Sequence, residues 1–187
     1  MPSLSETDRR VALQLARAAV VEAISHRKLP DAIPREGIFA ERHSVFVTLH
    51  VRQRLQGCIG VIEPHKPLGE AIVRCAADAA TEDPRFAPMR ADQLGELGIE
   101  ISLLSPIEPI APESIEIGRH GLLVRLRSQR GLLLPQVAVE HRMTREQFLE
   151  ETCRKAGLPR EAWRDPEARV FAFTCEVLSE DSRRKTD

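Results

Sequence analysis

Cys58 lies between two glycines, Gly57 and Gly60, in an apolar, β-branched stretch that starts at Arg54. Glycine inside a strand usually marks a bulge or a place where another backbone approaches closely. A thiol becomes a nucleophile or a ligand as the thiolate, which requires a nearby cation, a helix N-terminus or a general base. The stretch therefore predicts a site centred on Cys58. The alternative is a small buried cysteine in a glycine-rich strand.

Two further residues would complete a Cys–His–carboxylate arrangement, with His120 as the base and Glu100 as the group that orients it. His120 stands between glycines, in a turn whose backbone N–H groups could also bind an anion. An ordinary turn is the alternative. Glu100 interrupts an apolar strand, so it either faces the solvated side of a sheet or is buried, paired and raised in pKa.

The sequence also indicates residues that contact a substrate. Arg85 follows Asp83-Pro84, where a guanidinium could contact an acidic group, although the segment could equally be a helix stop with a hydrophobic anchor. Gln136 follows Pro135 at a strand end, where either a ligand contact or a backbone cap is expected. The predicted substrate-binding residues are Gln56, Gly57, Gly60, Arg85 and Gln136.

The remaining cysteines and the histidines do not indicate a metal site. The six histidines show none of the short spacings typical of ligands, and the four cysteines include no C-x-x-C pair. Cys75, Cys153 and Cys175 fall on apolar faces and are predicted to be reduced core residues. We therefore predict no metal and no cofactor.

Composition limits the classes of function. The 187 residues carry 27 Lys and Arg against 28 Asp and Glu, a net charge of −1, with 4% aromatic residues. A general single-strand nucleic-acid binder needs a basic groove and stacking platforms, so the net charge and the aromatic content argue against that role. No signal peptide and no apolar run long enough to span a bilayer are visible, which predicts a cytoplasmic protein.

Periodicity predicts helices at 6–26 (with Ser5 as N-cap), from Pro67 to before Pro84, and from Thr144, which can form a capping box with Gln147, to Gly157. Strands are predicted at 44–51, 54–62, 98–104, 122–127, 131–134 and 169–178, and the tail 180–187 is expected to fray. In 54–62, alternation places Leu55, Gly57, Ile59 and Val61 on one face and Gln56, Cys58, Gly60 and Ile62 on the other. The pattern favours an α+β fold with a mainly antiparallel sheet flanked by helices.

Several stretches together resemble the AMMECR domain family, whose bacterial and archaeal members are often called AmmeMemoRadiSam system protein A. The resemblance covers 8–179 and rests on Phe46-Val47-Thr48-Leu49, Leu55-Gln56-Gly57-Cys58-Ile59-Gly60, Glu82-Asp83-Pro84-Arg85-Phe86, Ile99-Glu100-Ile101-Ser102-Leu103-Leu104-Ser105-Pro106, Gly118-Arg119-His120-Gly121-Leu122 and Arg130-Gly131-Leu132-Leu133-Leu134-Pro135-Gln136-Val137-Ala138. It implies two α/β subdomains with a cleft between them, lined by these motifs. Gln56 replaces an arginine common in the family, and Met143 replaces a tryptophan.

The resemblance implies a Memo-like protein and a radical-SAM protein as partners, but it supplies no reaction. Two hypotheses follow. The protein is a cysteine-dependent enzyme or enzyme component that uses Cys58 with His120 and Glu100, or it is a non-catalytic binding or adaptor module for a protein partner or RNA. Gln56 removes the fixed cation that would most simply activate the thiol of Cys58.

Overall fold

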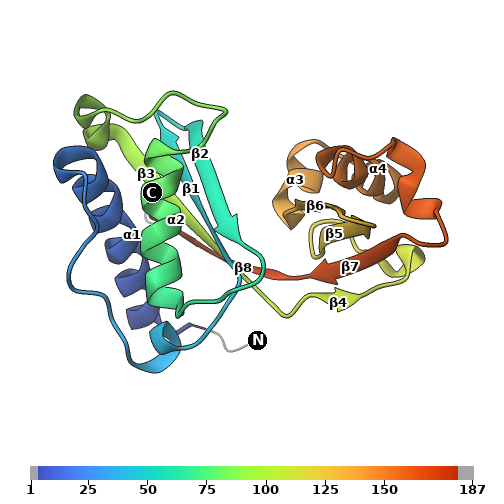
Figure 1. Cartoon of the computed structure of the whole chain (residues 1–187), viewed down its shortest axis with the longest axis horizontal. Helices are drawn as coiled ribbons and strands as arrows, with labels where there is room; N and C mark the ends of the chain where they lie inside the picture. Colours follow the sequence, from blue (N-terminus) through green and yellow to red (C-terminus); the bar gives the residue numbers. More distant parts are fainter. Residues whose placement is uncertain (1–3, 181–187) are drawn as a thin grey trace, which may run out of the picture. The chain divides into compact units, whose positions relative to one another are not determined.

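The computed structural model describes residues 4–180 and shows two compact units, each with its own four-stranded antiparallel sheet and helices (Figure 1). Of the described residues, unit 1 comprises 4–103 and 176–180, and unit 2 comprises 104–175. The architecture confirms the predicted α+β class.

In unit 1 the strand order is β2-β1-β3-β8, with β1 antiparallel to both of its neighbours. The helices α1 and α2 cover one face of this sheet, and α2 packs directly on β1 and β2 (Figure 1). The elements are α1 Glu6–His26, the 3-10 turn η1 Gly37–Ala40, β1 Val45–Val51, β2 Arg54–Val61, α2 Leu68–Thr81, η2 Ala91–Glu96, β3 Leu97–Leu104 and β8 Cys175–Ser179.

Alternation along the strands explains which face α1 and α2 cover. Val45, Val47 and Leu49 of β1 have no exposed surface and point to the helices. On β2, a Cβ atom at Gly57 would lie 2.0 Å from the carbonyl oxygen of Ala79 in α2. Any side chain at Gly57 would therefore push α2 away, which is the close backbone approach that the glycine predicted.

A β-bulge in β2 changes one predicted face. Gly57 pairs with Leu49 but Leu55 pairs with His50, so Gln56 is the extra residue of the bulge. Residues directly opposite each other on neighbouring strands share a face, so Leu55 lies on the face of His50 and Cys58. The prediction that Leu55 shares a face with Gly57 is therefore wrong, because strict alternation does not survive a bulge.

Arg52 and Gln53 form the two-residue turn between β1 and β2. Both have positive φ, 51° and 62°, as a type I′ hairpin turn requires. Asn and Gly are the residues that usually occupy such positions, which explains why the sequence did not mark the turn. The side chain of Arg52 forms two hydrogen bonds with Glu96, at 2.6 and 2.7 Å.

In unit 2 the strand order is β4-β7-β5-β6, again antiparallel. The elements are β4 Glu108–Pro109, η3 Pro112–Ser114, β5 Gly121–Leu126, β6 Gln129–Leu133, α3 Pro135–Glu140, α4 Arg145–Lys155, η4 Arg160–Arg164 and β7 Arg169–Phe173. The sequence did not predict α3, in which Pro135 both ends the strand segment and supplies the first helical turn. A Cβ atom at Gly131 would lie 2.4 Å from the backbone nitrogen of Ala156, so α4 packs tightly on β6.

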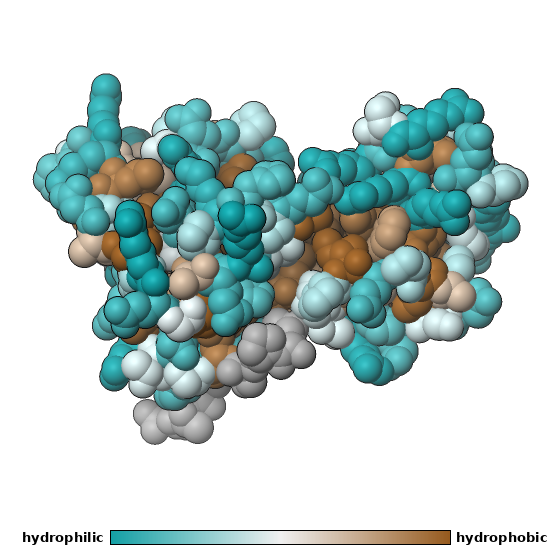
Figure 2. Space-filling model, turned by 60° about the horizontal axis from the view of Figure 1, so that its bottom comes forward, coloured by the Kyte–Doolittle hydropathy of each residue, from teal (hydrophilic) through white to brown (hydrophobic). Residues whose placement is uncertain are grey.

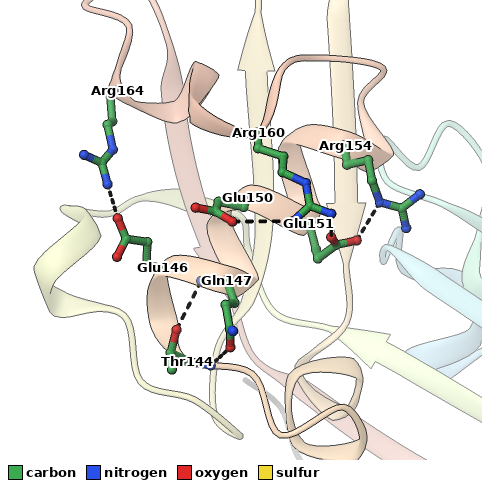
Figure 3. A network of polar contacts seen from close by, with 8 residues as sticks. All are labelled: Thr144, Glu146, Gln147, Glu150, Glu151, Arg154, Arg160 and Arg164. Atoms are coloured by element: carbon green, nitrogen blue, oxygen red, sulfur yellow. Dashed lines mark hydrogen bonds and ion pairs between the residues drawn. The ribbon is translucent and has the colours of Figure 1, made fainter.

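Ion pairs join α4 to η4 on the outer side of α4 (Figure 3). Arg160 contacts Glu150 and Glu151, Arg154 contacts Glu151, and Arg164 contacts Glu146. At the N-terminus of α4, Thr144 and Gln147 form the predicted capping box: the Thr144 hydroxyl accepts from the N–H of Gln147, and the Gln147 side chain accepts from the N–H of Thr144.

The predicted last strand, 169–178, is two strands in the structure. β7 belongs to the sheet of unit 2 and β8 to that of unit 1, and Thr174 lies between them. Thr174 is held by Ser105, whose N–H donates to the Thr174 carbonyl and whose hydroxyl accepts from the Thr174 N–H, both at 2.9 Å. Sequence periodicity continues across this change of sheet and therefore did not reveal it.

Glu180 corrects the predicted start of the frayed tail. Its carboxylate accepts hydrogen bonds from Arg17 at 2.8 and 2.6 Å and from the N–H of Ile99 at 3.1 Å. Glu180 is therefore part of unit 1, and the rest of the predicted tail lies outside the described residues. In residues 4–180 no helix is long and apolar enough to cross a membrane.

The surface of both units is mixed in polarity. On the face drawn in Figure 2, hydrophilic residues cover most of the surface, and apolar residues show between them. Among the described residues, the large apolar side chains that are most exposed are Leu55, Ile117, Val139 and Val177. The exposure of Leu55 follows from the bulge, which turns it away from α2.

Candidate functional site

Cys58, Thr48 and Glu100 form a row across three neighbouring strands of unit 1. Thr48 of β1 pairs with Cys58 of β2 on one side and with Glu100 of β3 on the other. All three lie on the sheet face opposite α1 and α2, and all are partly buried. The Thr48 hydroxyl donates a hydrogen bond to the Cys58 sulfur, with 3.2 Å between Oγ1 and Sγ.

The two backbone polar groups of Cys58 both contact the segment that follows α2. The Asp83 carboxylate accepts from the N–H of Cys58 at 2.9 Å, and Nη2 of Arg85 donates to the carbonyl of Cys58 at 3.2 Å. β2 is an edge strand, so these two contacts satisfy backbone groups that no neighbouring strand reaches. The position of Cys58 is therefore fixed through its own peptide groups.

Asp83 and Arg85 form a bidentate ion pair beside Cys58. The Asp83 carboxylate accepts from Nε and Nη2 of Arg85 at 2.9 and 2.6 Å, and from the Arg85 N–H at 3.1 Å. The Asp83 side chain is 2% exposed, whereas that of Arg85 is 46% exposed. The predicted contact between Arg85 and an acidic group is thus present, within the protein itself, and half of the Arg85 side chain still faces solvent.

The Asp83–Arg85 pair supplies the charged groups near the sulfur of Cys58. The Arg85 side chain holds the pKa of Asp83 well below its ordinary value. Burial opposes this shift, and the hydrogen bonds from the N–H groups of Cys58 and Arg85 lower the pKa further. The pKa of Arg85 is raised, first by its hydrogen bonds with Asp83, and the nearby Cys58 side chain contributes in the same direction. A guanidinium beside a sulfur favours thiolate over thiol. The sequence offered no cation at position 56, because Gln56 replaces the family's arginine. In the structure Arg85 supplies a cation near Cys58.

The other predicted residues of β2 shape the surroundings of Cys58. Gln56 donates from Nε2 to the carbonyl of Ala87 at 3.0 Å and so ties the bulge to the segment after Arg85. A Cβ atom at Gly60 would lie 2.3 Å from the ring of Phe46, which crosses the strand at that point. Gly57, by contrast, contacts α2 on the opposite face, so its part in this site is to bring β2 close to the helix.

His120 and Gln136 belong to unit 2, so each is described within that unit. Nδ1 of His120 accepts a hydrogen bond from the N–H of Glu116 at 3.1 Å, which places the proton of the neutral ring on Nε2. In this tautomer Nε2 of His120 is a hydrogen-bond donor, while Nδ1 is occupied by the Glu116 N–H. Gln136 occupies the first turn of α3. Their predicted roles remain predictions.

The remaining cysteines differ from Cys58 in their surroundings. Cys75 and Cys153 have no exposed surface, and burial raises the pKa of Cys75 to about 12 and raises that of Cys153. Cys175 is partly buried, as is Cys58. In residues 4–180 no group of three or more His, Cys, Asp and Glu is arranged to hold a metal ion.

Sequence reasoning missed Thr48 and the role of Asp83. Thr48 becomes relevant only through strand pairing, which a single sequence does not display. Asp83 did have a signal, because an acid two residues before an arginine permits a local ion pair, but its contact with the Cys58 N–H joins residues 25 positions apart. Both omissions concern contacts that depend on the folded backbone.

These features define an α+β protein of two units with a partly buried cysteine clamped on an edge strand. The family model described as AMMECR1 matches residues 13–178. The chain therefore belongs to the AMMECR1 family, as its motifs indicated.

Several proteins resemble this chain over nearly its whole length. A protein of Methanothermobacter thermautotrophicus is 43% identical and the alignment covers 95% of this chain and 97% of the relative. A protein of Aquifex aeolicus is 41% identical, with 92% and 93% covered. The crystal structure of an uncharacterised protein from Pyrococcus horikoshii matches with a TM-score of 0.85 and 39% identity, over 93% of this chain and 92% of that one.

Proposed function

We propose that the protein is a cysteine-dependent enzyme, or a component of one, in which Cys58 is the reactive group. The observation that carries the proposal is the set of polar contacts made by this one residue. The N–H and the carbonyl of Cys58 both bind the Asp83–Arg85 ion pair, and the sulfur accepts a hydrogen bond from the Thr48 hydroxyl. A cysteine that only fills space needs packing, not this set of polar contacts.

In this proposal Thr48 and Arg85 stabilise the thiolate, and Asp83 positions Arg85 and the strand. Glu100 lies next to Thr48 in the row, on the side away from Cys58, so the Cα atoms of Glu100 and Cys58 are roughly 10 Å apart. This separation suits a contact of Glu100 with a substrate or with Thr48 better than direct contact with the sulfur. His120 would act first as a hydrogen-bond donor through Nε2, and as a base only after its ring releases Glu116. A cleft between the units remains a prediction of the family resemblance.

A Memo-like protein and a radical-SAM protein are the proposed partners, in a cytoplasmic setting. The support for them is the family resemblance alone. Substrate contacts are proposed for Arg85, whose side chain is half exposed beside the sulfur, and for Gln56, Gly60 and Gln136.

Thiol alkylation tests the reactive state of Cys58. We expect iodoacetamide to modify Cys58 of the folded chain faster than Cys175 at neutral pH, because only Cys58 has Thr48 and Arg85 beside it. Peptide-resolved mass spectrometry would measure each rate. Cys175 is the matched control because it too is partly buried, whereas Cys75 and Cys153 would lag through burial alone.

Equal or slower labelling of Cys58 than of Cys175 would remove the thiolate proposal. The binding or adaptor function would then be the better account, and it has its own readout. Together with slow labelling of Cys58, recovery of the Memo-like or radical-SAM partner by Cys58→Ser at the wild-type level in a pull-down would favour an adaptor over an enzyme. Loss of the partner together with slow labelling would make the site around Cys58 the recognition surface. Retention on a filter with RNA at low salt would extend that role to nucleic acid.

A further inference from the structure

Unit 1 contains a hollow of about 480 Å³ that involves neither Cys58 nor its neighbours. We call it the α1–α2 hollow, because it is formed by the end of α1 with the residues after it, by α2, and by the segment before η2. Its volume is of the size that small-molecule sites have. Its apolar lining is Ala23, Ile24, Leu29, Ala77, Pro88 and Met89.

Charges of both signs line the same hollow. Asp78 and Arg74 are four residues apart on α2 and therefore on one side of the helix, and Arg27 lies just past the end of α1. Within residues 4–180, the side chains of these three residues make no hydrogen bond or ion pair. The other charged residues of the lining are Lys28, which contacts Glu22 and Asp31, and the exposed Glu82.

Asp78 is the partly buried charge of this set. Burial raises the pKa of Asp78, Arg74 opposes that shift, and Glu82 adds to it. A partly desolvated carboxylate gains most from a cation that reaches it within hydrogen-bond distance. Arg74 and Arg27 are exposed and can receive an anion at the rim.

We propose that the α1–α2 hollow binds a small zwitterion with an apolar side chain, of the amino-acid type. Its ammonium would contact Asp78, its carboxylate would contact Arg74, and its side chain would lie against Leu29 and Met89. A ligand with both charges matches the lining, whereas an amine or an acid alone leaves one side of it unused. The proposal is independent of the thiol chemistry at Cys58.

Three matched probes test the charge requirement on the full chain: L-leucine, isoamylamine (which lacks its carboxylate) and isocaproate (which lacks its amine). Nitrogen–proton correlation spectra would report amide shifts during titration with each probe. We expect L-leucine to shift amides in 23–29 and 74–82 and the amide of Met89, and to bind at least about tenfold more tightly than either single-charge probe. No shift in these segments with L-leucine, or equal binding of isoamylamine, overturns the proposal.

Variants test the residues. Asp78→Asn and Arg74→Gln should each weaken L-leucine binding about tenfold, whereas Asp92→Asn, an exposed acid paired with Arg90 outside the hollow, should leave it unchanged. Unchanged affinity in both Asp78→Asn and Arg74→Gln would refute the assignment. If Asp78→Asn does not fold, Arg74→Gln decides, because Arg74 is exposed and its replacement removes no buried contact.

Discussion

At the scale of single residues, the sulfur of Cys58 and the backbone groups of Cys58 form hydrogen bonds with different partners. Thr48 contacts the sulfur, and the Asp83–Arg85 pair contacts the backbone. This division allows each contribution to be removed separately. A change at Thr48 alters the hydrogen bond to the sulfur without releasing the strand, whereas a change at Asp83 removes a contact of the Cys58 backbone and also frees Arg85.

Thr48→Val removes the hydroxyl but keeps the shape of the side chain. The lost hydrogen bond stabilises the thiolate more than the thiol, so the pH of half-maximal alkylation at Cys58 should rise by about half a unit to one unit. The measurement is the iodoacetamide rate at Cys58 against pH. Thr48→Ser keeps the hydroxyl and should behave as the wild type; a shift of equal size in both variants would show that packing, not the hydrogen bond, sets the reactivity.

Asp83→Asn should destabilise the protein by about 2–3 kcal/mol at neutral pH, because it leaves Arg85 without its partner and weakens the hold on the Cys58 N–H. Since the pKa of Asp83 is depressed in the folded state, its contribution is complete above its ordinary pKa of about 4 and is lost as the pH falls below that value.

Urea unfolding of the wild type and Asp83→Asn at a series of pH values measures this difference. The gap between the two proteins should be constant from pH 7 to about 5 and should narrow below about pH 4. Asp92→Asn is the control, since Asp92 is exposed and its ion pair with Arg90 is a surface pair of little value. A gap that stays constant down to acid pH would mean that the Asp83 charge is not what stabilises the fold.

At the scale of elements, the hairpin of β1 and β2 combines two departures from regular strand geometry. Its turn uses Arg52 and Gln53 in the left-handed region, which costs roughly 1–2 kcal/mol per residue. Its second strand bulges at Gln56, three residues later. The bulge lets Gly57 face α2 while Leu55 and Cys58 both face the other way.

Gln53→Gly should stabilise the protein by about 0.5–1 kcal/mol, because the relief of positive φ exceeds the entropy that glycine loses on folding. The Arg52–Glu96 contact is untouched by this change. The melting temperature of Gln53→Gly, compared with that of the wild type, shows whether the change stabilises the protein. Arg54→Gly, at the next position with ordinary φ, should destabilise instead; stabilisation by both would indicate an effect on the unfolded chain alone.

The sequence predicted regular elements well where one local rule was enough. The cap at Ser5, the capping box at Thr144 and the alternation of β1 are properties of short segments, and each is present in the structure. It failed where a long-range constraint overrides the local pattern, as at Gln56, where the bulge adapts β2 to α2. The site follows the same division, since Cys58 and Arg85 were predicted but Thr48 and Asp83 were not linked to them.

At the scale of the whole chain, unit 1 is discontinuous in sequence. Its sheet needs β8, which arrives only after the chain has completed unit 2 and passed Thr174. Leu178 of β8 is 3% exposed in the core of unit 1, and Glu176 pairs with Arg9 while Glu180 pairs with Arg17. The last strand thus connects to the first helix, at the opposite end of the sequence.

A chain that ends at Cys175 should therefore be less stable in unit 1 than a chain that ends at Glu180. Loss of the buried Leu178 removes about 2–3 kcal/mol, and loss of the partners of Arg9 and Arg17 adds to it. At about 2–4 °C per kcal/mol for a chain of this length, the melting temperature should fall by roughly 10 °C. Calorimetry of the two truncated chains makes the comparison. Equal melting temperatures would show that β8 adds nothing to unit 1 beyond what β1, β2 and β3 supply.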